Sequence, residues 1–349
     1  MLPENTVLDE VRGPKEIAEL IDLTSTTYRV EHEQVSLEQI SLRPDGIVQT
    51  PAGEWRVTRQ FLEGAAKAIG MPLGYAYTIR PELFCENFAQ RQMDAARPVT
   101  ISRVGDVATG LILDGSSRYR PAASADVLRV IQRAFDLEFR RASVSYEGVD
   151  AEFITPGRVV EPIRGDVIEV GVILTNSESG GRQLKVSAYS YRLICTNGAI
   201  MSDNIGIVRW PNDVRMTYTG CLRAVEKGVR ELCEALEPVA ANYLRAVGRQ
   251  LPDNELWNAW RRVAQHVPRP EADEVLGVSE SQRRDLQQLM RTRHPSEPAT
   301  LTEHAASDVH NRLPHAAHGR TFRVRRALQE IGGDLLSRAA AWPLAPSMN

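Results

Sequence analysis

Residues 171–200 read GVILTNSESGGRQLKVSAYSYRLICTNGAI and contain the clearest strand pattern in the chain. Apolar residues alternate with period two on both sides of Ser179-Gly180-Gly181, as in two half-buried strands joined by a tight turn. The pattern predicts one strand from Val167 to Asn176 and a second from Leu184 to Cys195. Asn197-Gly198 tolerates the positive φ of a hairpin turn, so we expect a further strand at 199–208.

Further elements are expected on both sides of this hairpin. Strand pairs are predicted at 142–146 with 151–154, and at 99–104 with 107–113, where Gly105-Asp106 supplies the turn. The spacing of apolar residues predicts helices at 14–23, 58–69, 81–93, 125–140, 254–265, 279–293 and 319–340. Thr58 is expected to cap the second of these helices and Ser124 the fourth. The pattern indicates an α+β fold, with a mixed, mainly antiparallel curved sheet flanked by helices and a helical C-terminal region.

A long apolar seam runs through residues 222–247, where Leu222, Val225, Val229 and later apolar residues follow at steps of three or four. Such a seam packs either on the sheet or on a partner subunit, so a homo-oligomer formed through 222–247 is one expectation. Pro238 should kink or break this helix.

Composition narrows the class of protein. The chain has 349 residues, 42% of them hydrophobic, and a formal net charge of −3, which excludes a fibre, a wholly disordered chain and a disulfide mini-protein. Of its 42 basic residues, 38 are arginine, for which the codon bias of a GC-rich genome is the simplest explanation. Residues 1–50 carry a net charge of −6 and residues 281–349 one of +4. A general DNA-coating protein is therefore not indicated, but a local basic site is still compatible with these numbers.

Three regions follow from these patterns. We expect an acidic N-terminal segment at 1–44, an α+β core domain at 45–250 and a helical, Arg/His-rich region at 251–349. Within the last region, a linker at 266–274 is expected to separate the helices predicted at 254–265 and 279–293. The first residues do not show the basic and apolar regions typical of a signal peptide, so none is expected, and the longest apolar run, 167–175, is too short to span a membrane. We expect a cytoplasmic protein with no membrane contact and reduced thiols.

Standard catalytic and cofactor motifs are absent from the sequence. It has no Walker-type loop, no dinucleotide Gly-rich turn, no His-Glu-x-x-His, no Cys-x-x-Cys and no Gly-x-Ser-x-Gly. We therefore expect no cofactor, and we favour the hypothesis that the protein is not an enzyme. Five of the seven histidines lie at 294–318, but no cysteine lies nearby and the acids are scattered, so no metal site is predicted. Cys195 is expected to be a small buried residue.

Basic and aromatic side chains suggest a nucleic-acid contact. Arg118 and Arg120 flank Tyr119 directly before the helix predicted to start at Ser124, an arrangement suited to phosphate contact and base stacking. The alternative is a solvated loop whose tyrosine packs on that helix. Arg192 lies on an otherwise apolar strand face, where it needs either a ligand or a buried acid such as Glu169. The C-terminal arginines complete the predicted set: Arg320, Arg323, Arg325 and Arg326.

The opposite face of this strand carries Tyr189 and Tyr191, which either stack on bases or form a core layer. A second group of polar residues surrounds the two predicted turns and would form the site of an enzyme: Asn176, Ser177, Glu178, Arg192 and Asn197.

The stretch at 171–200 closely resembles the signature of an uncharacterised family of phage- and plasmid-encoded proteins that carry a domain of unknown function. The stretches VTRQFLEGAAKAIGMPLGYAYTI at 57–79 and SSRYRPAASADVLRVI at 116–131 are similar to two further elements of that family. The resemblance covers roughly residues 45–235. It implies a setting in mobile elements, hence DNA replication, recombination, repair or host takeover. The expected build is also similar to that of phage single-strand annealing proteins.

Three hypotheses remain open at this point. The first is a nonenzymatic nucleic-acid-binding protein, acting on single-stranded DNA in recombination or replication by binding or annealing strands. The second is an enzyme of unknown reaction built on the polar residues of the two turns. The third is an oligomeric scaffold or host-interaction protein formed through the 222–247 helix.

Overall fold

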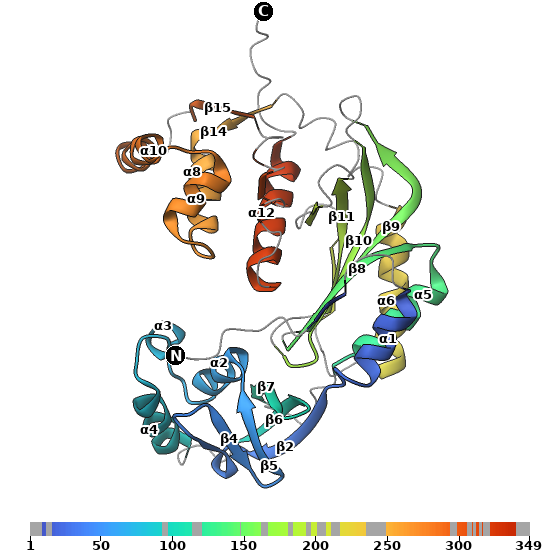
Figure 1. Ribbon diagram of the computed structural model, residues 1–349, viewed down its shortest axis with the longest axis vertical. Helices are drawn as coiled ribbons and strands as arrows, with labels where there is room; N and C mark the ends of the chain where they lie inside the picture. Colours follow the sequence, from blue (N-terminus) through green and yellow to red (C-terminus); the bar gives the residue numbers. More distant parts are fainter. Residues whose placement is uncertain are drawn as a thin grey trace, which may run out of the picture.

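The computed structural model describes residues 9–11, 16–92, 97–113, 121–146, 148–161, 167–180, 184–192, 197–200, 207–210, 217–234, 249–293, 299–305, 309, 312–313, 316 and 322–339. Two mainly antiparallel sheets with packed helices, and a C-terminal part rich in helices, give the predicted α+β fold (Figure 1). Each sheet has its own main apolar core.

The first sheet lies within residues 31–113 and has the strand order β2-β6-β7-β5-β4-β3, with β5 and β7 parallel and the other pairs antiparallel. Helix α2 begins as predicted after Thr58, whose Oγ1 accepts from the Phe61 N–H at 3.2 Å, and its buried face packs on the sheet. Two strands of this sheet, β2 and β3, come from the acidic N-terminal segment 1–44. The elements are β2 (Glu31–Ser36), η1 (Leu37–Gln39), β3 (Ser41–Leu42), β4 (Ile47–Thr50), β5 (Gly53–Val57), α2 (Arg59–Ala68), α3 (Leu73–Ala76), α4 (Pro81–Gln92), β6 (Pro98–Val104) and β7 (Val107–Leu113).

The second sheet is built around the hairpin predicted from the sequence. Its order is β1-β8-β9-β10-β11-β12, and β13 also pairs with β11; every pair is antiparallel. The strands are β1 (Asp9–Val11), β8 (Glu138–Ser145), β9 (Gly148–Val160), β10 (Ile168–Asn176), β11 (Leu184–Arg192), β12 (Asn197–Ile200) and β13 (Ile207–Trp210).

Three helices cover one face of this sheet: α1 (Ile17–Ser25), α5 (Ser124–Ala134) and α6 (Tyr218–Glu234), as Figure 1 shows. Val172 and Leu174 of β10 and Val186 of β11 are fully buried in the same apolar core as residues of these helices. Val225, Val229 and Leu232 of α6 are buried within this core. The described half of the 222–247 seam therefore packs on the chain's own sheet.

The remaining elements form the C-terminal part. They are β14 (Gln250–Pro252), α8 (Asp253–Val263), α9 (Arg269–Leu276), α10 (Glu280–Thr292), β15 (Leu301–Ala305) and α12 (Phe322–Ala339). Helix α9 occupies most of the stretch predicted as a linker, because Ala272, Val275 and Leu276 have apolar partners that bury them. Gly277, at φ 69°, ends that helix in the left-handed conformation.

Two further local predictions, about a helix end and a turn, were wrong. The helix expected at 125–140 ends at Ala134, and Phe139 belongs to β8, where its ring packs edge-on against Phe153 with centroids 5.7 Å apart. Pairing of β8 with β9 outweighs the helical spacing of the sequence. Asn197 and Gly198 do not form a turn but begin β12, where their backbones pair with Arg192 and Tyr191.

No helix within the described ranges is both long and apolar enough to cross a lipid bilayer.

The two sheets touch where β7 meets the turn after β10. A Cβ placed on Gly110 of β7 would lie 2.0 Å from the backbone oxygen of Ser179, so only glycine allows this approach.

We expect Gly110→Ala to lower the free energy of unfolding by about 1–3 kcal/mol, because the backbone must shift to remove the overlap. Chemical denaturation, followed by circular dichroism, measures this free energy for the variant and the wild type. Gly74→Ala is the matched control, because a Cβ there meets no atom within 4 Å. Equal stability of the two variants would contradict the close contact between the sheets.

Candidate functional site

The turn after β10 contacts the first residues of helix α5. Asn176 Nδ2 donates to the Ala122 carbonyl at 2.7 Å and to Ser124 Oγ at 3.1 Å. The Ser124 N–H donates to Glu178 Oε1 at 2.7 Å. Helix α5 is therefore capped by a carboxylate distant in sequence, and the predicted cap, the Ser124 side chain, is not used for this purpose.

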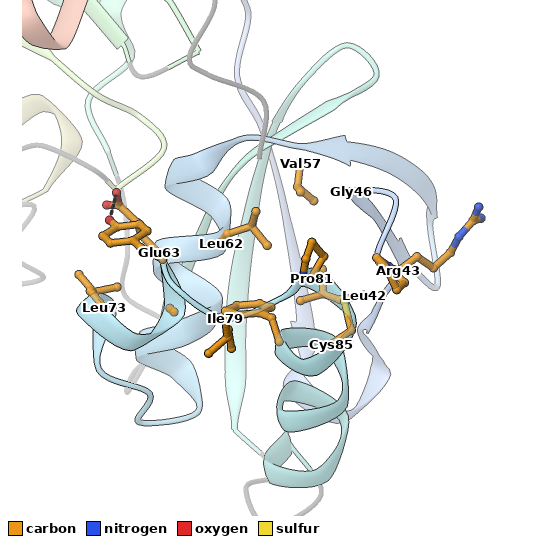
Figure 2. A pocket seen from close by; sticks show the side chains of 14 residues that line it. Leu42, Arg43, Gly46, Val57, Leu62, Glu63, Leu73, Ile79, Pro81 and Cys85 are labelled. Carbon is orange, nitrogen blue, oxygen red and sulfur yellow. Dashed lines mark hydrogen bonds between the residues drawn. The ribbon is translucent and has the colours of Figure 1, made fainter. Parts of the chain in front are cut away.

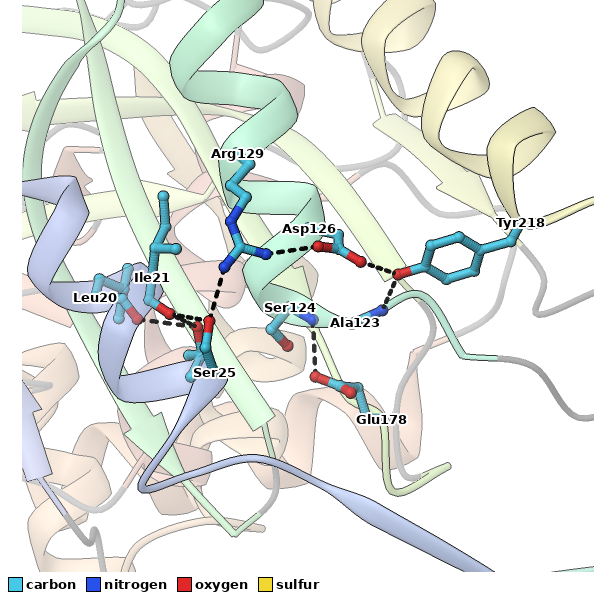
Figure 3. Close-up of polar contacts among 10 residues, drawn as sticks. Leu20, Ile21, Ser25, Ala123, Ser124, Asp126, Arg129, Glu178 and Tyr218 are labelled. Atoms are coloured by element: carbon cyan, nitrogen blue, oxygen red, sulfur yellow. Dashed lines mark hydrogen bonds and ion pairs between the residues drawn. The ribbon is translucent and has the colours of Figure 1, made fainter.

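A tyrosine from α6 completes the arrangement (Figure 3). The Ala123 N–H donates to the Tyr218 hydroxyl at 3.2 Å, and that hydroxyl donates to Asp126 Oδ2 at 2.6 Å. The second oxygen of Asp126 pairs with Arg129 at 2.7 Å. Three consecutive residues, 122, 123 and 124, are thus held by side chains from three different positions of the chain.

The electrostatics of this network follow from burial next to a helix N-terminus. Burial raises the pKa of Glu178, the hydrogen bonds from Ser124 lower it, and the neighbouring Asp126 raises it again, with a net upward shift. Burial and the hydrogen bond to Asp126 raise the pKa of Tyr218. Two acids at the start of α5 interact favourably with the helix dipole. The same acids oppose the binding of an anion at this helix end.

The other side of the turn reaches the first sheet. Gln60 Nε2 of α2 donates to the Ser179 carbonyl at 3.0 Å, and Ser179 Oγ lies 2.6 Å from Thr109 Oγ1 of β7. Ser102 Oγ lies 3.4 Å from the carbonyl oxygen of Glu178. The turn is therefore the place where the two sheets and helix α5 meet.

The predicted polar group is brought together only in part. Asn176 and Glu178 converge on Ser124, while Ser177 is fully buried and its hydroxyl has no hydrogen-bond partner among the described residues. Asn197 and Arg192 are neighbours in the backbone pairing of β11 and β12, but their side chains lie outside the described part of the chain.

The predicted basic residues fall largely outside the described residues. Arg118, Tyr119, Arg120 and Arg320 lie outside them, as do the side chains of Arg323 and Arg325. Pro121, the first described residue after the Arg118–Arg120 stretch, leads directly into the segment held by Asn176, Tyr218 and Glu178.

Arg326 has a structural position. It is 7% exposed, and its guanidinium contacts Asp150 Oδ1 at 2.7 Å, Glu330 Oε1 at 3.0 Å and the Thr175 hydroxyl. These contacts join α12 to the face of the second sheet opposite α5. Arg326 is therefore a buried ion-pair partner and does not belong to the basic surface residues.

The same sheet face contains a second buried polar group. Tyr189 is fully buried and donates to Glu152 Oε2 at 2.6 Å, and Arg141 Nε donates to the same oxygen at 2.7 Å. Burial raises the pKa of Tyr189 well above its usual value, and the charge of Glu152 adds to the shift. Tyr189 therefore belongs to a core layer and is not a surface for stacking bases; the side chain of Tyr191 lies outside the described part.

The sequence reasoning missed Tyr218 and Asp126. An acid in the first turn of a predicted helix is a recognisable signal, so Asp126 could have been found. Tyr218 carries no signal, because its partners lie 92 and 95 positions earlier in the chain.

Metal ligands and thiols give no further site. Within the described ranges, no three His, Cys, Asp or Glu side chains come together as ligands for a metal ion. Of the histidines at 294–318, His304 is described, and its Nε2 lies 3.0 Å from the Gly277 carbonyl. Burial raises the pKa of Cys221 and, to about 11, that of Cys233; Cys195 lies outside the described residues.

Comparison with known families gives a match to residues 115–326, and the family is described as a domain of unknown function, DUF932. The matched range holds most of the second sheet, α5, α6 and the C-terminal elements up to the start of α12. It reaches further toward the C-terminus than the resemblance seen in the sequence, and it does not include the first sheet. No curated protein and no solved structure matches the chain.

We expect Asn176→Ala to lower the free energy of unfolding by about 1–3 kcal/mol, because the variant leaves the buried Ala122 carbonyl without its donor. Asn87→Ala is the matched control: its side chain also donates to a backbone carbonyl, that of Leu83 at 2.8 Å, but at an exposed position. Urea denaturation measures the free energy of unfolding of both variants and of the wild type. A larger loss in the control would contradict the role assigned to Asn176.

The contribution of Glu178 to stability should depend on pH. The pKa of Glu178 lies above its ordinary value of 4.5 in the folded chain, so the folded state binds a proton more tightly than the unfolded state. This difference stabilises the folded state fully at pH values below 4.5. The stabilisation is lost as the pH rises through the folded pKa. The stability of the wild type relative to Glu178→Gln should therefore fall over that interval. Denaturation curves at a series of pH values measure it, and a difference that rises with pH would contradict the assignment.

Proposed function

The chain belongs to the family described as domain of unknown function DUF932, and we propose that it is a nonenzymatic protein that binds single-stranded nucleic acid through the loop at 114–120. The observation that carries the proposal is the way this loop is anchored. Asn176, Tyr218 and Glu178 hold residues 122–124, immediately after Arg118, Tyr119 and Arg120.

The chemistry of the loop supports this choice of ligand. Arginine contacts phosphate through several N–H groups, and tyrosine stacks on bases of any sequence. The acids at the start of α5 oppose a phosphate at the helix end itself, so phosphate contacts would be made by the arginines of the loop. Because residues 122–124 are held by side chains, fixing the residues just before them costs less conformational entropy on binding than fixing a segment with no anchored neighbour.

The position of the loop also favours a binding role. It runs in the chain from Leu113, the last residue of β7, to Pro121, and the next residue, Ala122, is held by Asn176 at the turn that also contacts the first sheet. Arg320, Arg323 and Arg325, near the start of α12, are the second group of basic residues in the proposal. With the phage and plasmid setting that the sequence resemblance implies, strand binding or annealing in replication or recombination is the proposed process.

The two alternatives have less support. Asn176 Nδ2 and Glu178 Oε1, at the core of the proposed enzymatic site, hold the start of α5. The apolar residues of α6, on which the oligomeric scaffold depends, are buried against the chain's own sheet.

The test is fluorescence anisotropy with a labelled single-stranded oligonucleotide at two salt concentrations. We expect binding at low salt, and in Arg118→Ala/Arg120→Ala a weaker affinity with a salt slope smaller by about 1.4, the value for two lost phosphate contacts on a single strand. Tyr119→Ala should weaken binding by about 1–3 kcal/mol if one base stacks on the ring.

The control is Arg56→Ala/Arg284→Ala, which removes the same charge from two exposed positions. It should bind like the wild type. A wild type that does not bind at low salt, or a loop variant that binds as well as the control, would refute the proposed function. Mixing labelled complementary strands with the protein then separates annealing from simple binding.

A further inference from the structure

The first sheet and its helices enclose a pocket with a volume of about 120 Å³ (Figure 2). It lies between α2, α3, α4 and the turn at 43–46. Most of its wall is carbon, supplied by Leu42, Val57, Leu62, Leu73, Ile79 and Phe84. Val57, Leu62 and Phe84 are buried core residues, so the wall is part of the packed interior of this sheet.

The polar groups around the pocket are engaged with one another. The Arg43 guanidinium pairs with Asp45 at 2.5 Å and lies 3.5 Å from Glu54. The Tyr77 hydroxyl donates to Glu63, whose carboxylate lies 3.5 Å from Arg59. A ligand that entered with an unpaired polar group would bury it without a partner, which costs free energy.

The charged residues around the pocket also disfavour an anionic ligand. The acids Asp45, Glu54, Glu63 and Glu82 outnumber the two arginines, Arg43 and Arg59, that stand around the pocket. An anion such as a carboxylate or phosphate is repelled, and this property separates the pocket from the phosphate contacts proposed for the 114–120 loop.

An exposed aromatic side chain lines the pocket. Tyr77 is 42% exposed and follows directly after α3, on which Tyr75 is 48% exposed. The Arg59 guanidinium lies 4.4 Å from the centre of the Tyr77 ring and helps to hold that ring in place. A cavity of roughly 150 Å³ lined by aliphatic and aromatic side chains binds benzene, so the size here suits one six-membered ring or a branched aliphatic group.

We propose that this pocket is a binding site for an uncharged apolar group of the size of one six-membered ring, presented by a small molecule. The site stands apart from the nucleic-acid proposal, and neither depends on the other.

Cys85 provides a reporter for occupancy. Its thiol lines the pocket, and burial raises its pKa to about 11, so it is protonated and slow to alkylate near neutral pH. Cys221 is also half-buried but lies on α6, away from the pocket, and serves as the internal reference.

The experiment measures iodoacetamide alkylation of each cysteine by mass spectrometry in the full chain, with toluene or benzoate added. We expect toluene to slow the alkylation of Cys85 several-fold without changing Cys221, and benzoate at the same concentration to have little effect. No protection of Cys85 by toluene, or equal protection by benzoate, would overturn the proposal.

Two variants locate the effect. Ala76 lines the pocket, so Ala76→Phe should fill it and abolish the toluene effect, while Ala89→Phe makes the same change on the exposed side of α4 and should keep it. Protection that survives in a folded Ala76→Phe protein would place the toluene elsewhere. If that variant fails to fold, the comparison of toluene with benzoate in the wild type decides the question.

Discussion

The hydrogen bonds of the Asn176–Ser179 turn are the interaction on which the rest of the structure depends. Asn176 and Glu178 hold the start of α5, while Ser179 contacts α2 and β7 of the first sheet. One short turn therefore contacts both the first sheet and helix α5, and it belongs to the second sheet. Because its polar atoms are largely buried, each lost bond would leave a group that water cannot easily reach.

A second constraint acts on the opposite face of the larger sheet. Charged residues there are buried, and each has a partner from a different element: Arg326 of α12 with Asp150 of β9, and Arg141 of β8 with Glu152 of β9. Removing one member of such a pair is costly, so the Arg326–Asp150 contact helps to set where α12 lies on the sheet, while Arg141–Glu152 joins two neighbouring strands. Both polar groups serve the architecture, and this leaves the 114–120 loop and the pocket beside Tyr77 as the places where ligands are proposed.

The strand pattern could be predicted because its cause is local. The alternation along β10 and β11, the Thr58 cap of α2 and the turn at Gly105 all follow from residues adjacent in the chain. The prediction failed where distant partners compete. Phe139 continues the helical spacing of α5 but pairs in a strand against Phe153, and Asn197-Gly198 looks like a turn but forms the start of β12. Local preference cannot weigh such contacts, because their free energy comes from another part of the fold.

The sequence by itself determined the α+β class, the central hairpin, most helix positions and the family resemblance, since these depend on periodicity, caps and motif residues. Only the tertiary structure decided what the polar residues do. Asn176 and Glu178 hold a helix, Arg326 lies in a buried ion pair, and Tyr218 joins the site without any local signal. The reason is physical: a buried polar group needs a partner, and the fold chooses that partner from residues 50 or more positions away, which no local pattern records.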